Sequence, residues 1–140
     1  MDPGALRLGA LWAAWLFVML FHVELGLMPL FHGFSVEIKS QVSVTRLPRI
    51  FFAMLVYFLI PVLAMLLAFH AVSGPIAWSG ASGWRAAQFW LSAMYSGTNV
   101  AHLIADIKIP DARMDQVVLM LVLTLIGLLL NWQAWLWWQG

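Results

Sequence analysis

The stretch RAAQFWLSAMYSGTNVAHLIAD, residues 85–106, carries polar side chains at regular intervals within an otherwise apolar segment. Successive polar positions are three or four residues apart, which places them along one face of an α-helix. We call this face the polar seam; it consists of Arg85, Gln88, Ser92, Tyr95, Asn99, His102 and Asp106. Unpaired polar groups are costly in hydrocarbon, so the polar seam is expected to face other helices, a cavity or a cofactor.

The composition of the whole chain is that of an integral membrane protein. Of its 140 residues, 64% are hydrophobic and 9% are charged, whereas a soluble domain has about 25% charged residues. The net charge of +1 gives no electrostatic basis for binding nucleic acid. The absence of cysteine excludes disulfides, thiolate metal sites, cysteine nucleophiles and covalently attached c-type haem.

Four segments are long enough to cross the hydrocarbon core, which takes about 20 helical residues. We therefore predict an all-α, single-domain bundle of four transmembrane helices. The predicted spans are residues 6–31, 50–72, 85–107 and 114–138. The first span resembles the apolar part of a signal peptide, but no small-x-small cleavage motif follows it, so we expect it to be retained.

Local features refine these spans. Pro29 is expected to kink or end the first helix, because proline lacks an amide hydrogen and clashes with the preceding turn. Small side chains on one face of the second span would allow a neighbouring helix to approach closely. This small-residue face comprises Tyr57, Pro61, Ala64 and Ala68. Between these spans, residues 34–49 alternate apolar and polar side chains. That pattern predicts a short extended or hairpin segment at the cytoplasmic membrane surface, with an amphipathic helix as the alternative.

Charge and tryptophan distributions predict the orientation. The first and third loops hold Lys39, Arg46, Arg49, Lys108 and Arg113, against only Arg7 and Arg85 on the other side. Because cytoplasmic loops carry the excess of Lys and Arg, both termini are predicted on the non-cytoplasmic side. All nine tryptophans belong to the side with the termini, which indicates an interfacial aromatic belt and an even number of spans.

In this topology the ionisable residues gather near the inner side of the membrane, where they mark a candidate site. The candidate metal ligands are His22, His32, His102 and Asp106. His102 and Asp106 are i, i+4 neighbours, so the carboxylate can orient the imidazole or share a metal ion. These ligands suit zinc, iron, copper or manganese. His22 lies further from its helix end than His102 does. A metal or a haem b would therefore bridge them only if the first helix tilts or ends early. A pigment held by one histidine is a further alternative.

Glu24 is an intramembrane carboxylate that needs a separate explanation. It lies about 200° around the helix from His22, so the two side chains cannot both face the bundle centre. Either the helix unwinds at Gly26, or one of the two side chains contacts a partner protein.

Two functions follow as hypotheses. The leading one is a non-catalytic accessory, assembly or stabilising subunit, which contacts other membrane subunits or further copies of itself through the polar seam, Glu24 and residues 34–49. The alternative is a metal-, haem- or pigment-binding redox or transport protein built on the His/Asp cluster. The polar seam alone is also typical of purely structural hydrogen bonds between membrane helices. An enzyme is disfavoured, because no activated serine or phosphate-binding glycine loop is present.

Overall fold

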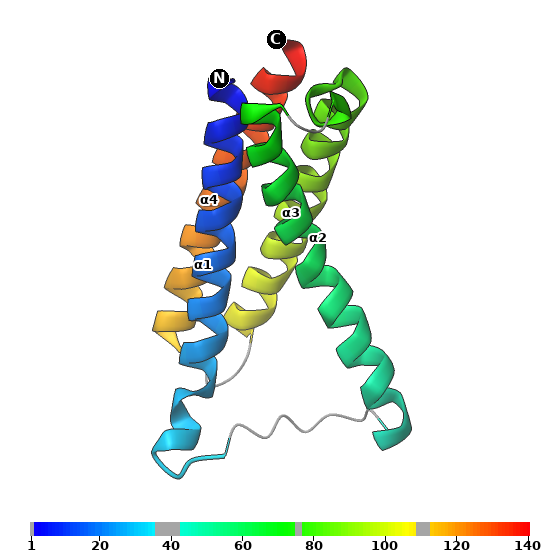
Figure 1. The fold of residues 1–140 in the computed structure, drawn as a ribbon. Coiled ribbons are helices and arrows are strands. Elements are labelled where there is room, and N and C mark those ends of the chain that lie inside the picture. Colours follow the sequence, from blue (N-terminus) through cyan, green and yellow to red (C-terminus); the bar gives the residue numbers. More distant parts are fainter. Residues whose placement is uncertain (1, 36–42, 75–76, 109–112) are drawn as a thin grey trace.

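The computed structural model describes residues 2–35, 43–74, 77–108 and 113–140, and within these ranges the chain is helical with no strand. Its elements are α1 (Pro3–Phe31), η1 (Val44–Arg46), α2 (Leu47–Ser73), η2 (Ala77–Gly80), α3 (Ser82–Lys108) and α4 (Met114–Gln139), where η denotes a 3-10 helix. The four long helices alternate in direction, so both termini lie at the same end of the molecule (Figure 1). The all-α prediction is confirmed.

Among the residues that the structure describes, three segments are long and apolar enough to cross a membrane: Pro3–Phe31, Val44–Ser73 and Met114–Gln139. This finding supports the prediction of an integral membrane protein. The remaining long helix, α3, is the one that carries the polar seam, which lowers its apolar content. Helix α3 is long enough to span a membrane but is not among the three apolar candidates.

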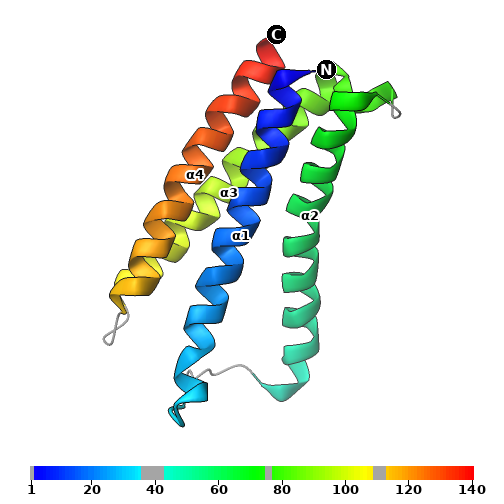
Figure 2. The ribbon, with the colours of Figure 1, turned by 60° about the vertical axis from the view of Figure 1, so that its left-hand side comes forward.

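Helix α4 packs against both α1 and α3, and α1 also packs against α2. Towards its first residues α2 diverges from α1, as both views show (Figures 1 and 2). Residues 48–56 of α2 are exposed without interruption, so no face of this stretch is covered by another helix. Further along α2, Pro61, Ala64 and Ala68 are buried, as expected for the small-residue face.

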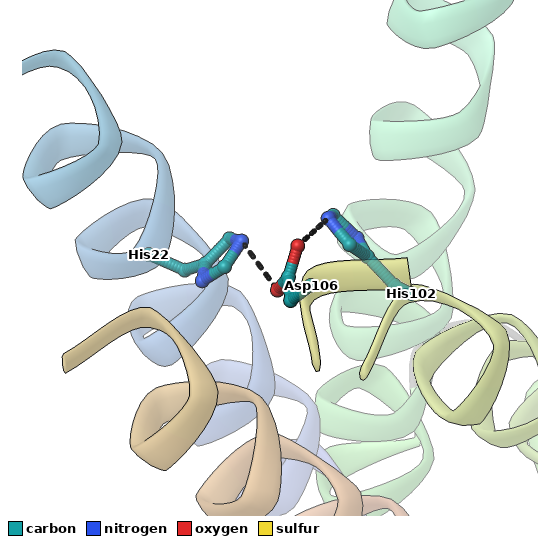
Figure 3. A group of neighbouring side chains, drawn as sticks. All are labelled: His22, His102 and Asp106. Carbon is teal, nitrogen blue, oxygen red and sulfur yellow. Dashed lines mark ion pairs between the residues drawn. The ribbon is translucent and has the colours of Figure 1, made fainter. Parts of the chain in front are cut away.

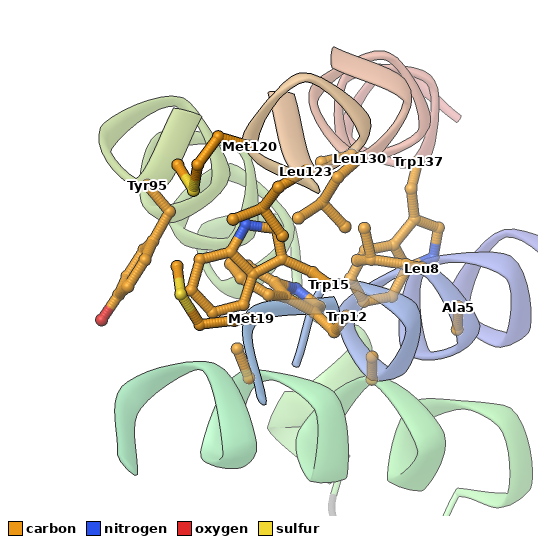
Figure 4. Packing of buried hydrophobic residues seen from close by; sticks show 13 residues of the cluster. Ala5, Leu8, Trp12, Trp15, Met19, Tyr95, Met120, Leu123, Leu130 and Trp137 are labelled. Carbon is orange, nitrogen blue, oxygen red and sulfur yellow. The ribbon is translucent and has the colours of Figure 1, made fainter. Parts of the chain in front are cut away.

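The core is built around three aromatic rings from α1 and α3. Trp12, Trp15 and Tyr95 pack edge to face, with ring centroids 5.4–6.1 Å apart (Figure 4). All three side chains are almost completely buried. The expectation that every tryptophan belongs to an interfacial belt is therefore wrong for Trp12 and Trp15, because both face the interior and pack against the polar seam.

Two prolines lie inside helices, and a side chain from another helix compensates for each. Proline has no amide hydrogen, so the carbonyl four residues earlier loses its helical donor. Pro61 leaves the Tyr57 carbonyl without a donor, and the Tyr95 hydroxyl donates to it at 2.5 Å. Pro29 does the same to the carbonyl of Leu25, which accepts from Arg113 Nη1 at 2.8 Å. In both helices a polar side chain thus replaces the backbone hydrogen bond that proline removes.

The ends of α1 differ in how they are held. Helix α1 ends at Phe31, close to Pro29 as predicted, and it stays helical through Gly26. At its start, Asp2 Oδ1 accepts from the amides of Gly4 and Ala5 at 2.8 and 3.2 Å, and Asp2 Oδ2 accepts from Trp137 Nε1 at 2.7 Å. Partial burial raises the pKa of Asp2, but these hydrogen bonds and the charge of Arg85 outweigh it and leave the pKa below 3.8. This network ties α1 to α3 and α4.

The segment between α1 and α2 is described only in part. Residues 36–42 lie outside the described residues, and so does most of the predicted alternating pattern. Ser43 is extended, Val44–Arg46 form a 3-10 turn, and α2 begins at Leu47, which is three residues before the predicted start of the second span.

Candidate metal centre

The buried polar side chains in the first half of the polar seam form hydrogen bonds, most of them to other helices and some within α3. Gln88 Oε1 accepts from Trp12 Nε1 at 2.9 Å, and Gln88 Nε2 donates to the Ala64 carbonyl at 2.8 Å. The Asn99 amide, oriented by its neighbours, accepts from Trp15 Nε1 at 2.8 Å and donates to the Tyr95 carbonyl at 3.3 Å. Gln88, Ser92, Tyr95 and Asn99 are at most 1% exposed. Because their partners are all in the bundle, these residues hold the helices together.

The second half of the polar seam meets α1 and forms a different kind of cluster. His22 Nε2 lies 3.7 Å from Asp106 Oδ2, and His102 Nε2 lies 3.6 Å from Asp106 Oδ1 (Figure 3). The two imidazole rings are 5.0 Å apart between centroids and nearly perpendicular. One nitrogen from each histidine and one carboxylate oxygen all lie within 4.8 Å of one another. We call these three residues the His/His/Asp cluster.

The position of α1 explains how His22 reaches His102. Helix α1 extends beyond the adjacent ends of α3 and α4, as Figures 1 and 2 both show. His22, nine residues before the last residue of α1, and His102, six residues before the last residue of α3, therefore come to the same level. His22 is further from its helix end than His102 is, but the extra length of α1 compensates for this difference.

The spacing of the cluster fits a small metal ion. A zinc ion bound at about 2.1 Å by tetrahedral ligands places neighbouring donor atoms about 3.4 Å apart. The distances from His22 Nε2 to Asp106 Oδ2 and from His102 Nε2 to Asp106 Oδ1 are 3.7 and 3.6 Å, and one donor atom from each residue lies within 4.8 Å of the others. Within the described part of the chain, His22 Nδ1 and Asp106 Oδ2 are buried without a hydrogen-bond partner. A metal ion would satisfy the carboxylate oxygen. Either ring nitrogen of His22, Nδ1 or Nε2, could serve as the ligand atom.

A haem between His22 and His102 does not fit this arrangement. The two axial nitrogens of a bis-histidine haem lie on opposite faces of the porphyrin. Here the two imidazole rings already contact each other, with centroids 5.0 Å apart, and the Asp106 carboxylate pairs with the Nε2 atom of each (Figure 3), so no porphyrin fits between them. The carboxylate favours a bare metal ion over a haem.

The other predicted site residues lie apart from the cluster. His32 caps the end of α1, is exposed and lies ten residues after His22, which corresponds to about 15 Å along a helix. Glu24 is exposed on the opposite side of α1 from the buried His22, as the predicted angle of about 200° requires. Since α1 is continuous through Gly26, the alternative in which the helix unwinds there is wrong.

Arg113, the N-cap residue of α4, contacts α1 close to His22, and this contact was not predicted from the sequence. Its guanidinium pairs with Asp115 and donates to the Leu25 carbonyl one turn after His22. From the sequence, Arg113 and Asp115 are members of a solvated loop with alternating charges. The signal that predicts the contact is Pro29, because it leaves the Leu25 carbonyl in need of a donor.

No family model, no curated protein and no solved structure matches this chain. Its function is therefore inferred from its own residues.

Proposed function

We propose that this chain is a four-span membrane protein that binds one divalent transition-metal ion through His22, His102 and Asp106. The observation that carries the proposal is the convergence of two imidazoles and one carboxylate, from two different helices, within 4.8 Å. Two histidines and a carboxylate are the protein ligands of many catalytic zinc sites and of non-haem iron(II) sites. Buried ionisable groups without other partners are costly to retain, which favours a functional role.

Three protein ligands would leave at least one coordination position open. Structural zinc sites usually have four protein ligands, whereas sites that act on a ligand keep one position for water or substrate. The cluster is open on one side only. The side chain of His102 is 46% exposed, whereas that of His22 is 8% exposed. The metal ion would be reached from the His102 side, where it would act as a Lewis acid or activate a bound water.

The proposal also includes four membrane spans, with α3 as one of them. Helix α3 has 27 residues, about 40 Å at 1.5 Å per residue, which exceeds the hydrocarbon thickness. Gln88, Ser92, Tyr95 and Asn99 are buried within the bundle, so α3 can cross the membrane despite its lower apolar content. With four spans, the charge distribution favours both termini on the non-cytoplasmic side.

Metal stoichiometry tests the proposal. The chain, purified without a histidine tag, is stripped with a chelator, reloaded with Zn²⁺ or Fe²⁺ and freed of unbound metal before elemental analysis. We expect about one ion per chain. We expect His102→Ala and Asp106→Asn to weaken the affinity at least about 100-fold, since even outer-shell changes cost 10- to 100-fold. The matched controls His32→Ala and His70→Ala, which alter exposed histidines outside the cluster, should retain the ion. Equal metal content in all variants would exclude the cluster as the site.

A second function, as an accessory subunit or homo-oligomer, is favoured by Glu24. This carboxylate lies on the exposed side of α1, within a helix that is apolar enough to span a membrane. An acidic side chain facing lipid is expensive, and a cation or hydrogen-bond donor from a neighbouring chain would offset the cost. We expect gentle extraction of native membranes to co-isolate a defined partner, and Glu24→Gln to weaken that association. A chain that migrates alone with and without the substitution would contradict this function.

A further inference from the structure

The imidazole of His102 lies on the side of the bundle that α2 leaves uncovered. The hydroxyls of Thr98 and Tyr57 are 2.6 Å apart, which fixes this face of α3 towards α2. His102 follows Thr98 by one helical turn on the same face. The corresponding stretch of α2, one turn before Tyr57, belongs to the uninterrupted exposed residues 48–56. The two helices therefore part between Thr98 and His102.

The exposed side chains next to His102 on α3, and those at the corresponding level of α2, are apolar. On α3, Ala105 is exposed and lies three residues after His102, on the same side of the helix. On α2, Ala53 and Met54 are exposed. A membrane would fill such surroundings with hydrocarbon chains rather than water, because they offer few hydrogen-bonding groups. A ligand arriving from this side must be soluble in the bilayer.

Charge decides which head group such a ligand needs. A divalent ion with Asp106 as its only anionic ligand leaves a net charge of +1 on a cluster in which the side chains of His22 and Asp106 are 8% and 13% exposed. Burying a net charge in an apolar medium is costly, and a singly charged anion at the open position removes that cost. Carboxylate oxygen is a ligand that zinc and iron both accept.

We infer that the open coordination position takes the carboxylate of a long-chain fatty acid, which reaches the metal sideways from the bilayer past His102. This inference rests on the metal binding proposed above. The hydrocarbon chain would lie along the exposed first half of α2, where Phe51, Phe52 and Leu55 are more than half exposed. The metal would hold the head group, and the bilayer would hold the tail.

Visible spectroscopy of the cobalt(II)-loaded chain in lipid nanodiscs tests the inference at pH 8. Three probes are compared: decanoate, acetate and methyl decanoate. We expect decanoate to shift the cobalt absorption bands at a total concentration at least about 100-fold lower than acetate, because its chain partitions into the bilayer. Methyl decanoate partitions as well but lacks the anionic head group, and it should leave the bands unchanged.

A pair of variants separates lateral access from partitioning alone. Ala105→Phe places a large side chain beside His102 and should weaken the decanoate response at least about tenfold, with the cobalt spectrum in the absence of decanoate unchanged. Ala10→Phe, on an exposed position near the start of α1, is the matched control and should respond as the unsubstituted chain does. Acetate acting as well as decanoate, no decanoate response, or an equal response in Ala105→Phe would overturn the inference while metal binding stands. Failure to bind cobalt at all would overturn both.

Discussion

Gln88 and His102 belong to the same face of α3, yet their side chains end in different environments. Gln88 is fully buried and both ends of its amide are paired, one with Trp12 and the other with the Ala64 carbonyl. His102 is partly exposed, and its imidazole contacts His22 and Asp106 of the His/His/Asp cluster. The first residue stabilises the bundle, whereas the second is available to a ligand.

The spacing of polar residues predicted which side chains of α3 are buried, but it did not predict their hydrogen-bond partners. Steps of three and four residues correctly placed Gln88, Ser92, Tyr95 and Asn99 on an inward face, because helical periodicity is a local property. The partners Trp12 and Trp15 were missed. Tryptophan is common at membrane interfaces, and only the three-dimensional packing shows that these two indole N–H groups point to amides of the polar seam.

Gly127 of α4 lies directly against the polar seam and provides a residue-scale prediction. A Cβ atom at Gly127 would lie 2.8 Å from Ser96 Oγ and 3.4 Å from the Asn99 amide, whereas at Gly97 nothing lies within 4 Å. We expect Gly127→Ala to lower the free energy of unfolding by about 1–2 kcal/mol through overpacking. Gly97→Ala should leave it unchanged or raise it by up to about 1 kcal/mol through helix propensity. Unfolding in mixed micelles measures both, and equal effects would contradict the packing described.

At the scale of the element, internal prolines link the helices in pairs. Pro61 of α2 is compensated by Tyr95 of α3, and Pro29 of α1 by Arg113 at the N-cap of α4. The sequence indicated where each helix would lose a hydrogen bond, since this follows from the proline itself. It did not indicate the replacement donor, because the donor comes from a helix more than thirty residues away.

The compensation at Pro61 predicts a measurable coupling. Tyr95→Phe should lower the free energy of unfolding by about 1 kcal/mol, because the Tyr57 carbonyl is left without a donor. In the Pro61→Ala background the restored backbone amide supplies that donor, so the same substitution should cost much less. A double-mutant cycle of unfolding free energies tests this. An identical cost of Tyr95→Phe in both backgrounds would show that the hydroxyl does not serve the orphaned carbonyl.

At the scale of the whole molecule, the four-helix order and the common end of the two termini were predictable, because both follow from the number of long apolar segments. The convergence of three ionisable residues was predictable only as a list of ligand types. His32 was included in that list but lies apart, and the overhang of α1 that aligns His22 with His102 is a property of the assembled bundle (Figure 1). The angle between His22 and Glu24 correctly predicted that they do not both face the bundle centre, but it did not predict that Glu24 would be the exposed one.

The absence of cysteine makes the topology testable with single introduced thiols. We expect Gly83→Cys and Gln139→Cys, at the start of α3 and the end of α4, to react with an impermeant maleimide from outside intact cells. Ser43→Cys, between α1 and α2, should react only after the membrane is permeabilised. If α3 does not cross the membrane, the first two thiols will label from opposite sides, which would leave three spans rather than four.

The central claim is that His22, His102 and Asp106 bind one metal ion together. X-ray absorption at the zinc edge, on chain loaded with one equivalent of Zn²⁺, tests this claim most directly. We predict nitrogen and oxygen ligands at about 2.0–2.1 Å and outer-shell scattering from two imidazoles, with one imidazole fewer or no bound zinc in His102→Ala. A spectrum without imidazole scattering, or the same spectrum from the His102→Ala variant, would contradict the account.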